Sequence, residues 1–344
     1  MSRMLRRVLG LTCTVMLALP VAASADPAPS ASGSGSASMS SGSTTATVGT
    51  SATAPTSTSP SDAATGALVD WSTLAPGLTD AYAANDPNIC NSGQTSCVEA
   101  TLHEMDRRLA PLQQACSHNA MFALLYDHIT RSYFNTVAAD PGFFHSNAFV
   151  NHEDAVFASY YFNAFDSYAA GNRAAVPGAW QIAFDAAGTH QVSGEGNILL
   201  GVNAHIQRDL PFVLYHIGLT EPDGTSLKPD HDKVNQILYG AFSDAINDAA
   251  AHLDPTVSPN LPPALAPLGY ATLFQPVEAW REQAFRYAEM LALAPDAAAR
   301  AAVSQLIEDN ATATAQLIRV ATAYAPLSSS ASRDAYCAAN PPAR

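Results

Sequence analysis

Apolar side chains recur at intervals of three and four residues along most of the chain after its first quarter. The clearest example is the series Val98, Leu102, Met105 and Leu109, whose members are spaced by four, three and four residues. This spacing places the side chains on one face of an α-helix. The stretch Ser96–Glu99 has the Ser-x-x-Glu form of a capping box, so the helix is predicted to begin there.

The same periodicity predicts a series of further helices and no run of strand alternation. Their expected ranges are 119–138, 151–170, 177–188, 196–217, 228–253, 275–293 and 295–323. The sequence therefore predicts an all-α fold, a single bundle-like domain of about eight helices.

Two of these helices have features that bear on function. The helix over 196–217 is apolar on most faces, so we place it at the centre of the bundle, and Pro211 should kink or divide it. The helix over 151–170 is predicted to begin at Asn151, a good N-cap. Glu153 and Asp154 then fall in its first turn, where the helix dipole favours acidic side chains.

The beginning of the chain differs in composition from the rest. Residues 1–25 combine three arginines, an apolar run and a final Ala-Ser-Ala, which is the pattern of a secretory signal peptide. Residues 26–68 consist almost entirely of Ser, Thr, Ala, Gly and Pro and are predicted to be a disordered linker. The helical domain is expected over 69–344, in a secreted protein that is extracellular or associated with the cell envelope.

The charge of the chain excludes one class of partner. Its formal net charge is −14, and removal of the three arginines of the signal leaves 13 basic against 30 acidic residues, or −17. Nucleic acid binding requires a basic surface, so no nucleic acid partner is expected. No later segment has an apolar run long enough for a membrane span.

Cys90, Cys97, Cys116 and Cys337 remain after the signal, an even number in an exported chain, and two disulfides are expected. Four cysteines allow three pairings. We favour Cys90 with Cys97 across a short loop, and Cys116 with Cys337, which ties the C-terminus to the early helices.

Polar residues inside the apolar helix suggest a metal site. His205 and Asp209 are four residues apart and share a helix face, as do paired ligands in helical zinc sites. Further ligands must come from other helices, and His152, Asp154 and His231 are the main candidates. Other candidates are His118, Asp127, His128, Asp230 and Asp232. The first hypothesis is a metal-dependent hydrolase, with zinc as the metal, that activates water.

Two alternatives remain open. His205 and Asp209 could simply satisfy each other's hydrogen bonds in the core. The protein could also be a non-catalytic helical module that binds a small apolar ligand or a cell-envelope component between its helices. In that case the pocket is expected to be lined by Tyr160, Tyr161, Phe162, Phe165 and Trp180, and Asn203 is a further candidate binding residue.

Several stretches also resemble an uncharacterised bacterial family, a domain of unknown function. The resemblance covers roughly Cys90 to Cys337 and implies a helical fold and secretion, with no functional role to carry over. It is carried by the signatures GNxLLGxNAHIxxDLP, over Gly196–Pro211, and NHEDAVFA, over Asn151–Ala158, and by the shorter stretches Trp180–Ala186, Lys228–Asp232 and Ala279–Glu282.

Overall fold

The structure is a computed structural model that describes residues 77–342 apart from 222, 258–265 and the side chains of 266–273. The signal peptide and the linker predicted over 1–25 and 26–68 lie outside these residues. The described part is all-helical, as predicted, and contains no strand, only two isolated β-bridges. Its elements are α3 (Thr95–Gln114), α4 (Ala120–Ala139), α5 (Asn147–Ala169), η1 (Arg173–Ala175), α6 (Gly178–Gly188), α7 (Gly194–Asn203), η2 (Ala204–Asp209), α8 (Leu210–Ile217), α9 (Lys228–His252), α10 (Ala266–Leu293), α11 (Ala297–Thr322) and α12 (Ala331–Ala339).

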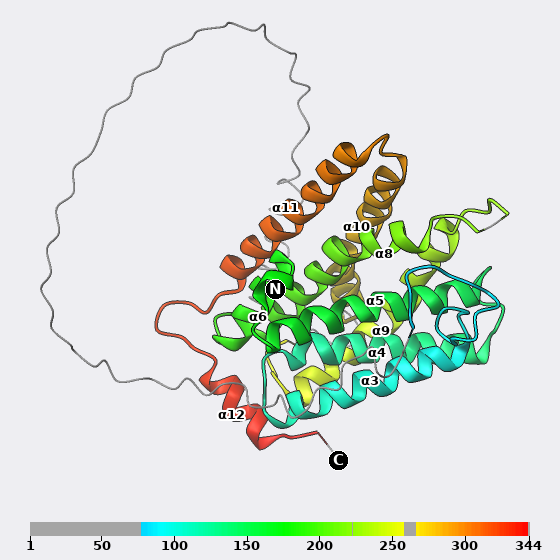
Figure 1. Cartoon of the computed structure of the whole chain (residues 1–344). Coiled ribbons are helices and arrows are strands. Elements are labelled where there is room, and N and C mark those ends of the chain that lie inside the picture. The colour runs from blue at the N-terminus through cyan, green and yellow to red at the C-terminus, as the bar shows by residue number, and fades with distance from the viewer. Residues whose placement is uncertain (1–76, 222, 258–265, 343–344) are drawn as a thin grey trace, which may run out of the picture.

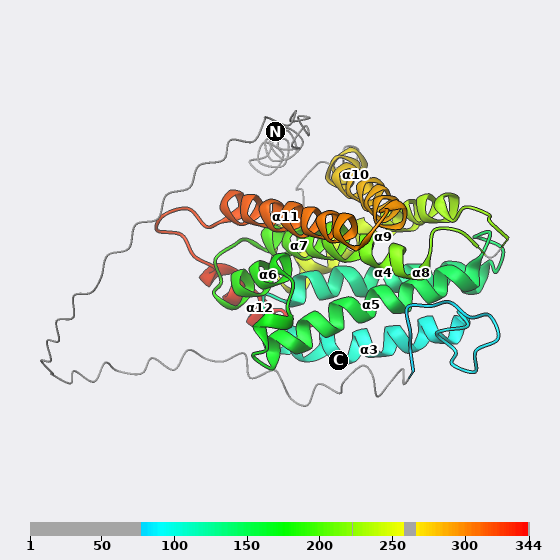
Figure 2. The same ribbon diagram turned by 45° about the horizontal axis from the view of Figure 1, so that its top comes forward.

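The helices are stacked in layers, which Figures 1 and 2 show from two directions. Helix α4 packs against α3 on one side and against α9 on another. The segment α7–η2–α8 lies between α4 and α5 on one side and α10 and α11 on the other, because it contacts all four of them. The most apolar helix is therefore central, as its sequence predicts.

The expected irregularity near Pro211 is a π-helical turn rather than a break. Residues Ala204–Asp209 form this turn, and the N–H of Leu210 donates to the carbonyl of His205, five residues earlier. Pro211 has no N–H and cannot make the ordinary bond to the carbonyl four residues back. The wider turn absorbs that loss, and the helix continues to Ile217.

Two predicted helix starts are wrong. Helix α3 begins at Thr95, and its N-cap Gln94 makes no side-chain capping bond. Helix α5 begins at Asn147, one turn before Asn151. The Asn151 side chain instead accepts from the Tyr133 hydroxyl at 2.6 Å and donates to the Gly93 carbonyl at 2.9 Å. Tertiary contacts therefore account for this polar residue, which the sequence pattern assigned to a cap.

Two elements near the C-terminus also differ from expectation. Helix α10 begins at Ala266 and contains Pro276, whereas the periodicity predicted a helix only from residue 275. The short helix α12 was not predicted, and its Cys337 is bonded to Cys116. Both expected disulfides are present, Cys90–Cys97 and Cys116–Cys337.

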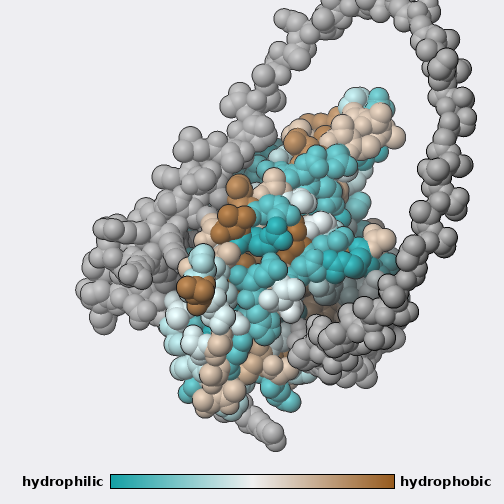
Figure 3. All heavy atoms as spheres, turned by 90° about the vertical axis from the view of Figure 1, so that its left-hand side faces the viewer, coloured by the Kyte–Doolittle hydropathy of each residue, from teal (hydrophilic) through white to brown (hydrophobic). Residues whose placement is uncertain are grey.

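Within the described part, no helix is both long and apolar enough to cross a membrane. Figure 3 shows one face of the molecule, on which hydrophobic residues occur in small separate groups among hydrophilic ones. The large apolar side chains are mainly inside, in one extended cluster and a smaller one around Tyr133, Phe144 and Val150.

Candidate functional site

A cavity of about 70 Å³ lies between α4, α5, α9 and α10, where the two hydrophobic clusters meet. One water molecule requires roughly 10–15 Å³ measured in this way, so the cavity can hold several waters or a small organic group. Most of its wall is apolar or aromatic. The lining residues are Tyr126, Ile129, Thr130, Tyr133, Val150, Glu153, Asp154, Phe157, Val234, Ile237, Leu238 and Arg281.

The polar atoms of this wall have few partners inside the protein. Seven buried side-chain atoms in the described part of the chain lack a hydrogen-bond partner. Three of them, the Tyr126 hydroxyl, the Thr130 hydroxyl and Asp154 Oδ2, belong to residues that line this cavity. A buried polar atom without a partner costs roughly 1–3 kcal/mol, so three around one cavity indicate a place for a polar guest.

Glu153 and Asp154 are the acidic groups of the cavity. Burial, followed by the charge of Glu153, raises the pKa of Asp154 to about 8. Burial also raises the pKa of Glu153 to about 7, although Arg281 opposes this shift. Both side chains keep a little accessible surface, and they line the cavity. Near neutral pH Asp154 is therefore mainly a neutral acid, and a nearby positive charge would ionise it.

Arg281 is buried in the same wall, but its guanidinium is already held by polar groups of α9. It donates to Asn235 Oδ1 at 2.8 Å and to the His231 carbonyl at 2.7 Å. Burial lowers its pKa to about 10, and Glu153 and Asp232 act against that shift. The positive charge of Arg281 thus acts on Glu153. The pKa of Asp154 is instead determined by burial and by the charge of Glu153.

His205 lies directly behind this wall. Its ring stacks on Phe157 with centroids 3.5 Å apart and is 4.6 Å from the Tyr126 ring. Its Nδ1 faces Asp209 Oδ2 at 3.4 Å, whereas Nε2 is buried without a partner. Burial lowers the pKa of His205 despite the nearby carboxylate, so the imidazole is neutral at pH 7. Its proton then belongs on Nδ1, toward Asp209, which leaves a lone pair on Nε2.

Asp209 is completely buried and already has several partners. The Trp180 indole N–H donates to its Oδ2 at 2.8 Å, and Arg208 donates to its Oδ1 at 3.0 Å. The expected pair of His205 and Asp209 is therefore adjacent, but both oxygens of this carboxylate already accept hydrogen bonds from Trp180 and Arg208.

The other histidines expected at the metal site are engaged elsewhere. The two ring nitrogens of His152 face the carbonyls of Cys90 and Asp80, at 3.0 and 3.1 Å. The Nε2 of His231 faces the carbonyl of Arg281 at 3.2 Å. Each imidazole fastens a loop or a helix to its neighbour.

The described residues contain one group of three His, Cys, Asp or Glu side chains with ligand atoms close enough to share an ion. It consists of His118, His190 and Asp334, whose ligand atoms lie within 4.8 Å of one another. The set proposed from the sequence, His205, Asp209, His152, Asp154 and His231, is thus not brought together. Among these five, only His205 and Asp209 make a contact with each other.

The residues expected to bind an apolar ligand are also placed elsewhere. The Tyr160 hydroxyl contacts His216 Nδ1 at 2.8 Å near the surface. Asn203 donates to the Ala311 carbonyl at 2.9 Å, which joins α7 to α11, and it accepts from Gln207 of η2. Trp180 lines a second cavity of only about 10 Å³, enough for one water at most.

Asp154 was predicted to take part in a metal site, whereas no function was predicted for Glu153, Tyr126, Thr130 or Arg281. The predicted start at Asn151 placed Glu153 and Asp154 in a first turn, where acids are unremarkable. Because α5 begins at Asn147, they lie within the helix and face the cavity. Tyr126 and Thr130 are four apart on α4 and share a face, which was the available signal. Arg281 is buried as well, although its charge gives no sign of burial in the sequence.

The chain belongs to the family of unknown function DUF5995, whose model matches residues 98–321. That range contains every residue that lines the larger cavity. No curated protein and no solved structure matches the chain significantly.

Proposed function

We propose that this chain is an exported helical protein that binds a small aliphatic amine in the cavity between α4, α5, α9 and α10. The observation that carries the proposal is Asp154, a carboxyl group in the cavity with one oxygen that has no hydrogen-bond partner. A cationic guest would supply both the missing hydrogen bond and the missing counter-charge.

The charges around the cavity favour a cation over an anion. Glu153 and Asp154 together can carry two negative charges, and Arg281 supplies one positive charge that is already hydrogen-bonded to α9. An ammonium group placed at Asp154 would leave the site neutral. Buried charges are tolerated when they are paired and hydrogen-bonded in this way. The hydroxyl oxygens of Tyr126 and Thr130 can accept the remaining N–H bonds.

The apolar and aromatic residues of the cavity wall determine which uncharged part of a ligand can bind. Val150, Val234, Ile237 and Leu238 offer apolar surface, and Phe157 and Tyr126 add aromatic rings that can attract a cation. The limited volume restricts the guest to a few heavy atoms. Ligands of that size bind with at most about −1.5 kcal/mol per heavy atom, so we expect dissociation constants of ~0.1–10 mM for the smallest amines.

Two observations support the exported part of the proposal. The chain has two disulfides, which persist in oxidising compartments. Its first 25 residues carry the sequence pattern of a secretory signal.

A metal-dependent hydrolase centred on His205 has one supporting observation, the free Nε2 of that ring. A catalytic zinc ion needs three protein ligands. Asp209 is held by Trp180 and Arg208, and the rings of His152 and His231 face backbone carbonyls. The cavity therefore supports ligand binding better than it supports metal-assisted hydrolysis.

Calorimetric titration of the disulfide-bonded chain with n-propylamine at pH 8 tests the proposal. n-Propanol has the same size without the charge and should bind at least tenfold more weakly. Asp154→Asn keeps the shape of the side chain but not its charge, and it should weaken propylamine binding by a similar factor. Asp309→Asn serves as the matched control, because Asp309 is an exposed aspartate on α11 that contacts Gln305.

Equal affinity for propylamine and propanol would overturn the proposal, since the carboxyl group would then play no part. Loss of binding in Asp309→Asn to the same degree as in Asp154→Asn would also overturn it.

A further inference from the structure

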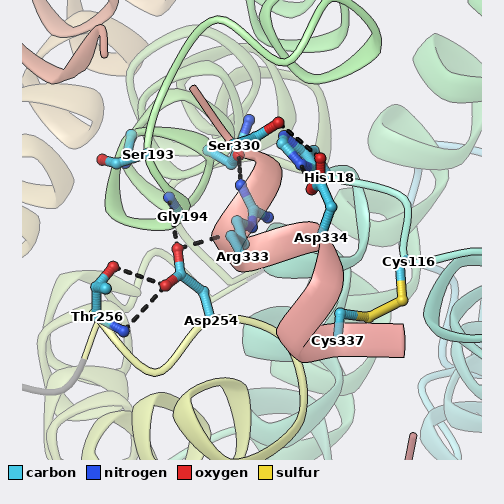
Figure 4. A network of polar contacts seen from close by, with 12 residues as sticks. Cys116, His118, Ser193, Gly194, Asp254, Thr256, Ser330, Arg333, Asp334 and Cys337 are labelled. Carbon is cyan, nitrogen blue, oxygen red and sulfur yellow. Dashed lines mark hydrogen bonds and ion pairs between the residues drawn. A yellow bond between two sulfur atoms is a disulfide. The ribbon is translucent and has the colours of Figure 1, made fainter. Parts of the chain in front are cut away.

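A second polar group lies at the end of the molecule where the C-terminal helix α12 packs. Its three main members come from distant parts of the chain. His118 precedes α4, His190 follows α6, and Asp334 lies in the first turn of α12. Figure 4 shows His118, Ser330 and Asp334 converging, with the Cys116–Cys337 disulfide also at this helix.

The ligand atoms of this group are already close to the spacing that an ion requires. His118 Nε2 is 2.8 Å from Asp334 Oδ1, and His190 Nδ1 is 3.3 Å from Asp334 Oδ2. Zinc bound tetrahedrally at its usual distance of about 2.0–2.1 Å separates neighbouring ligand atoms by ~3.3 Å. The two imidazole planes are stacked with an angle of 19° between them, so the exposed His190 ring must rotate out of this stack to aim its lone pair at the same ion as His118.

A fourth potential metal ligand, Ser330, lies beside these three residues. The Ser330 hydroxyl is 3.3 Å from His190 Nδ1 and donates to Asp334 Oδ2 at 2.6 Å. It could complete the coordination sphere or hold the carboxylate that does so. Arg333, the nearest cation on α12, is turned toward Asp254 and Asn197, with its Nη1 2.7 Å from Asn197 Oδ1.

The backbone at His190 is unusual for a histidine. The residue has φ of 54° and follows the C-cap of α6, a position that ordinarily favours glycine. A side chain there costs roughly 1–2 kcal/mol. Its ring stacks on that of His118 with centroids 3.9 Å apart, which brings its nitrogen to the shared carboxylate.

Access to the group is open on one side. The His118 side chain is 1% exposed and anchors the group in the core, whereas those of His190 and Asp334 are 44% and 34% exposed. An ion can thus enter from solvent and reach a buried imidazole. Imidazole and carboxylate ligands suit zinc among the common divalent metals.

We propose that His118, His190 and Asp334 form a zinc site that fastens α12 to the start of α4 and the end of α6. The ion would form a second cross-link beside the Cys116–Cys337 disulfide. This site is separate from the amine cavity and shares no residue with it.

The test is zinc titration of the full, disulfide-bonded chain after treatment with a chelator, by calorimetry and by native mass spectrometry. We expect one zinc ion per chain with a micromolar or lower dissociation constant. A zinc concentration a hundredfold above that constant should raise Tm by about 5 °C or more. Cobalt in place of zinc should give the visible absorption of a tetrahedral complex.

His190→Ala and Asp334→Asn should each weaken zinc binding at least tenfold and remove the Tm shift. Both side chains are partly exposed, so these variants should still fold. The control is His128→Ala, because His128 forms a similar pair with Asp248 at 2.7 Å. Asp248 also lies 3.6 Å from His252, but these three residues do not bring their ligand atoms close enough to share an ion. The proposal is overturned if the native chain takes up no zinc, or if His190→Ala and Asp334→Asn bind it as tightly as His128→Ala.

Discussion

The indole N–H of Trp180 donates to Asp209 Oδ2 at 2.8 Å, and both side chains are almost entirely buried. This contact joins α6 to the π-helical turn and fixes the carboxylate that faces His205. The Asp209 carboxylate of the central segment is thus held by its neighbours, whereas Asn197 Nδ2 and His205 Nε2 of the same segment are buried without a partner.

Replacement of Trp180 with Phe should destabilise the protein by about 3 kcal/mol. The change removes a hydrogen bond to a charged acceptor, worth about 1.5–3 kcal/mol, and some packing volume. Chemical denaturation of Trp180→Phe, Asp209→Asn and the double variant measures the coupling between the two residues. We expect a coupling energy of about 1–3 kcal/mol, and additive effects within ~0.3 kcal/mol would contradict the assignment.

The close packing of α7 depends on Gly201. A Cβ atom at this position would lie 2.3 Å from the Phe122 ring, so Gly201→Ala should destabilise the fold by roughly 1–3 kcal/mol. Gly240 on α9 has no neighbouring atom within 4 Å of such a Cβ. Gly240→Ala should instead stabilise the protein by about 0.5–1 kcal/mol. Urea denaturation midpoints of the two variants should move in opposite directions.

The two disulfides should contribute unequally to stability. Cys116–Cys337 spans 221 residues and Cys90–Cys97 spans seven. In the chain-entropy model the long loop is worth about 5 kcal/mol and the short one about half as much. Guanidinium denaturation of the two double Cys→Ser variants should show the larger loss for Cys116 and Cys337. A larger loss for the short loop would contradict this account.

The raised pKa of Asp154 predicts a specific dependence of stability on pH. Between about pH 4 and pH 8 this carboxyl group keeps its proton in the folded protein and loses it in the unfolded chain. Its contribution to the free energy of unfolding therefore falls as pH rises across this range. Asp154→Asn should match the native protein near pH 4 and be more stable by on the order of 5 kcal/mol at pH 8. Denaturation of both proteins at several pH values checks this, and a pH-independent difference would contradict it.

The fold was accessible from the sequence because each helix carries its apolar period locally. The period of α3 and the apolar character of α7 through α8 need no tertiary information. Helix boundaries were harder to predict from the sequence where contacts with distant residues, rather than local capping, determine where a helix begins. Asn151 is a residue type that favours N-caps, but its side chain accepts a hydrogen bond from the Tyr133 hydroxyl. The actual start of α5 is stabilised by Asp230 of α9, which accepts hydrogen bonds from the backbone amides of His145 and Ser146.

The candidate sites were less accessible for the same reason. A histidine in an apolar segment signals burial but not its partners, and His152 and His231 proved to face carbonyls distant in sequence. The His118, His190 and Asp334 group joins residues up to 216 positions apart, through a helix that the pattern did not predict. No local spacing could indicate that group.

We propose that Asp154 is a buried acid that lacks a hydrogen-bond partner and binds a cation. The titration of Asp154 itself is the most direct test of this proposal. The ¹³Cγ chemical shift of Asp154 should be followed with pH in the free protein and with saturating n-propylamine, with Asp154→Asn used to assign the signal. We expect a midpoint near pH 8 in the free protein and a clearly lower one with the amine, because the ammonium group stabilises the carboxylate. A free-protein midpoint near the ordinary value of about 4, or a midpoint that the amine leaves unchanged, would contradict the account.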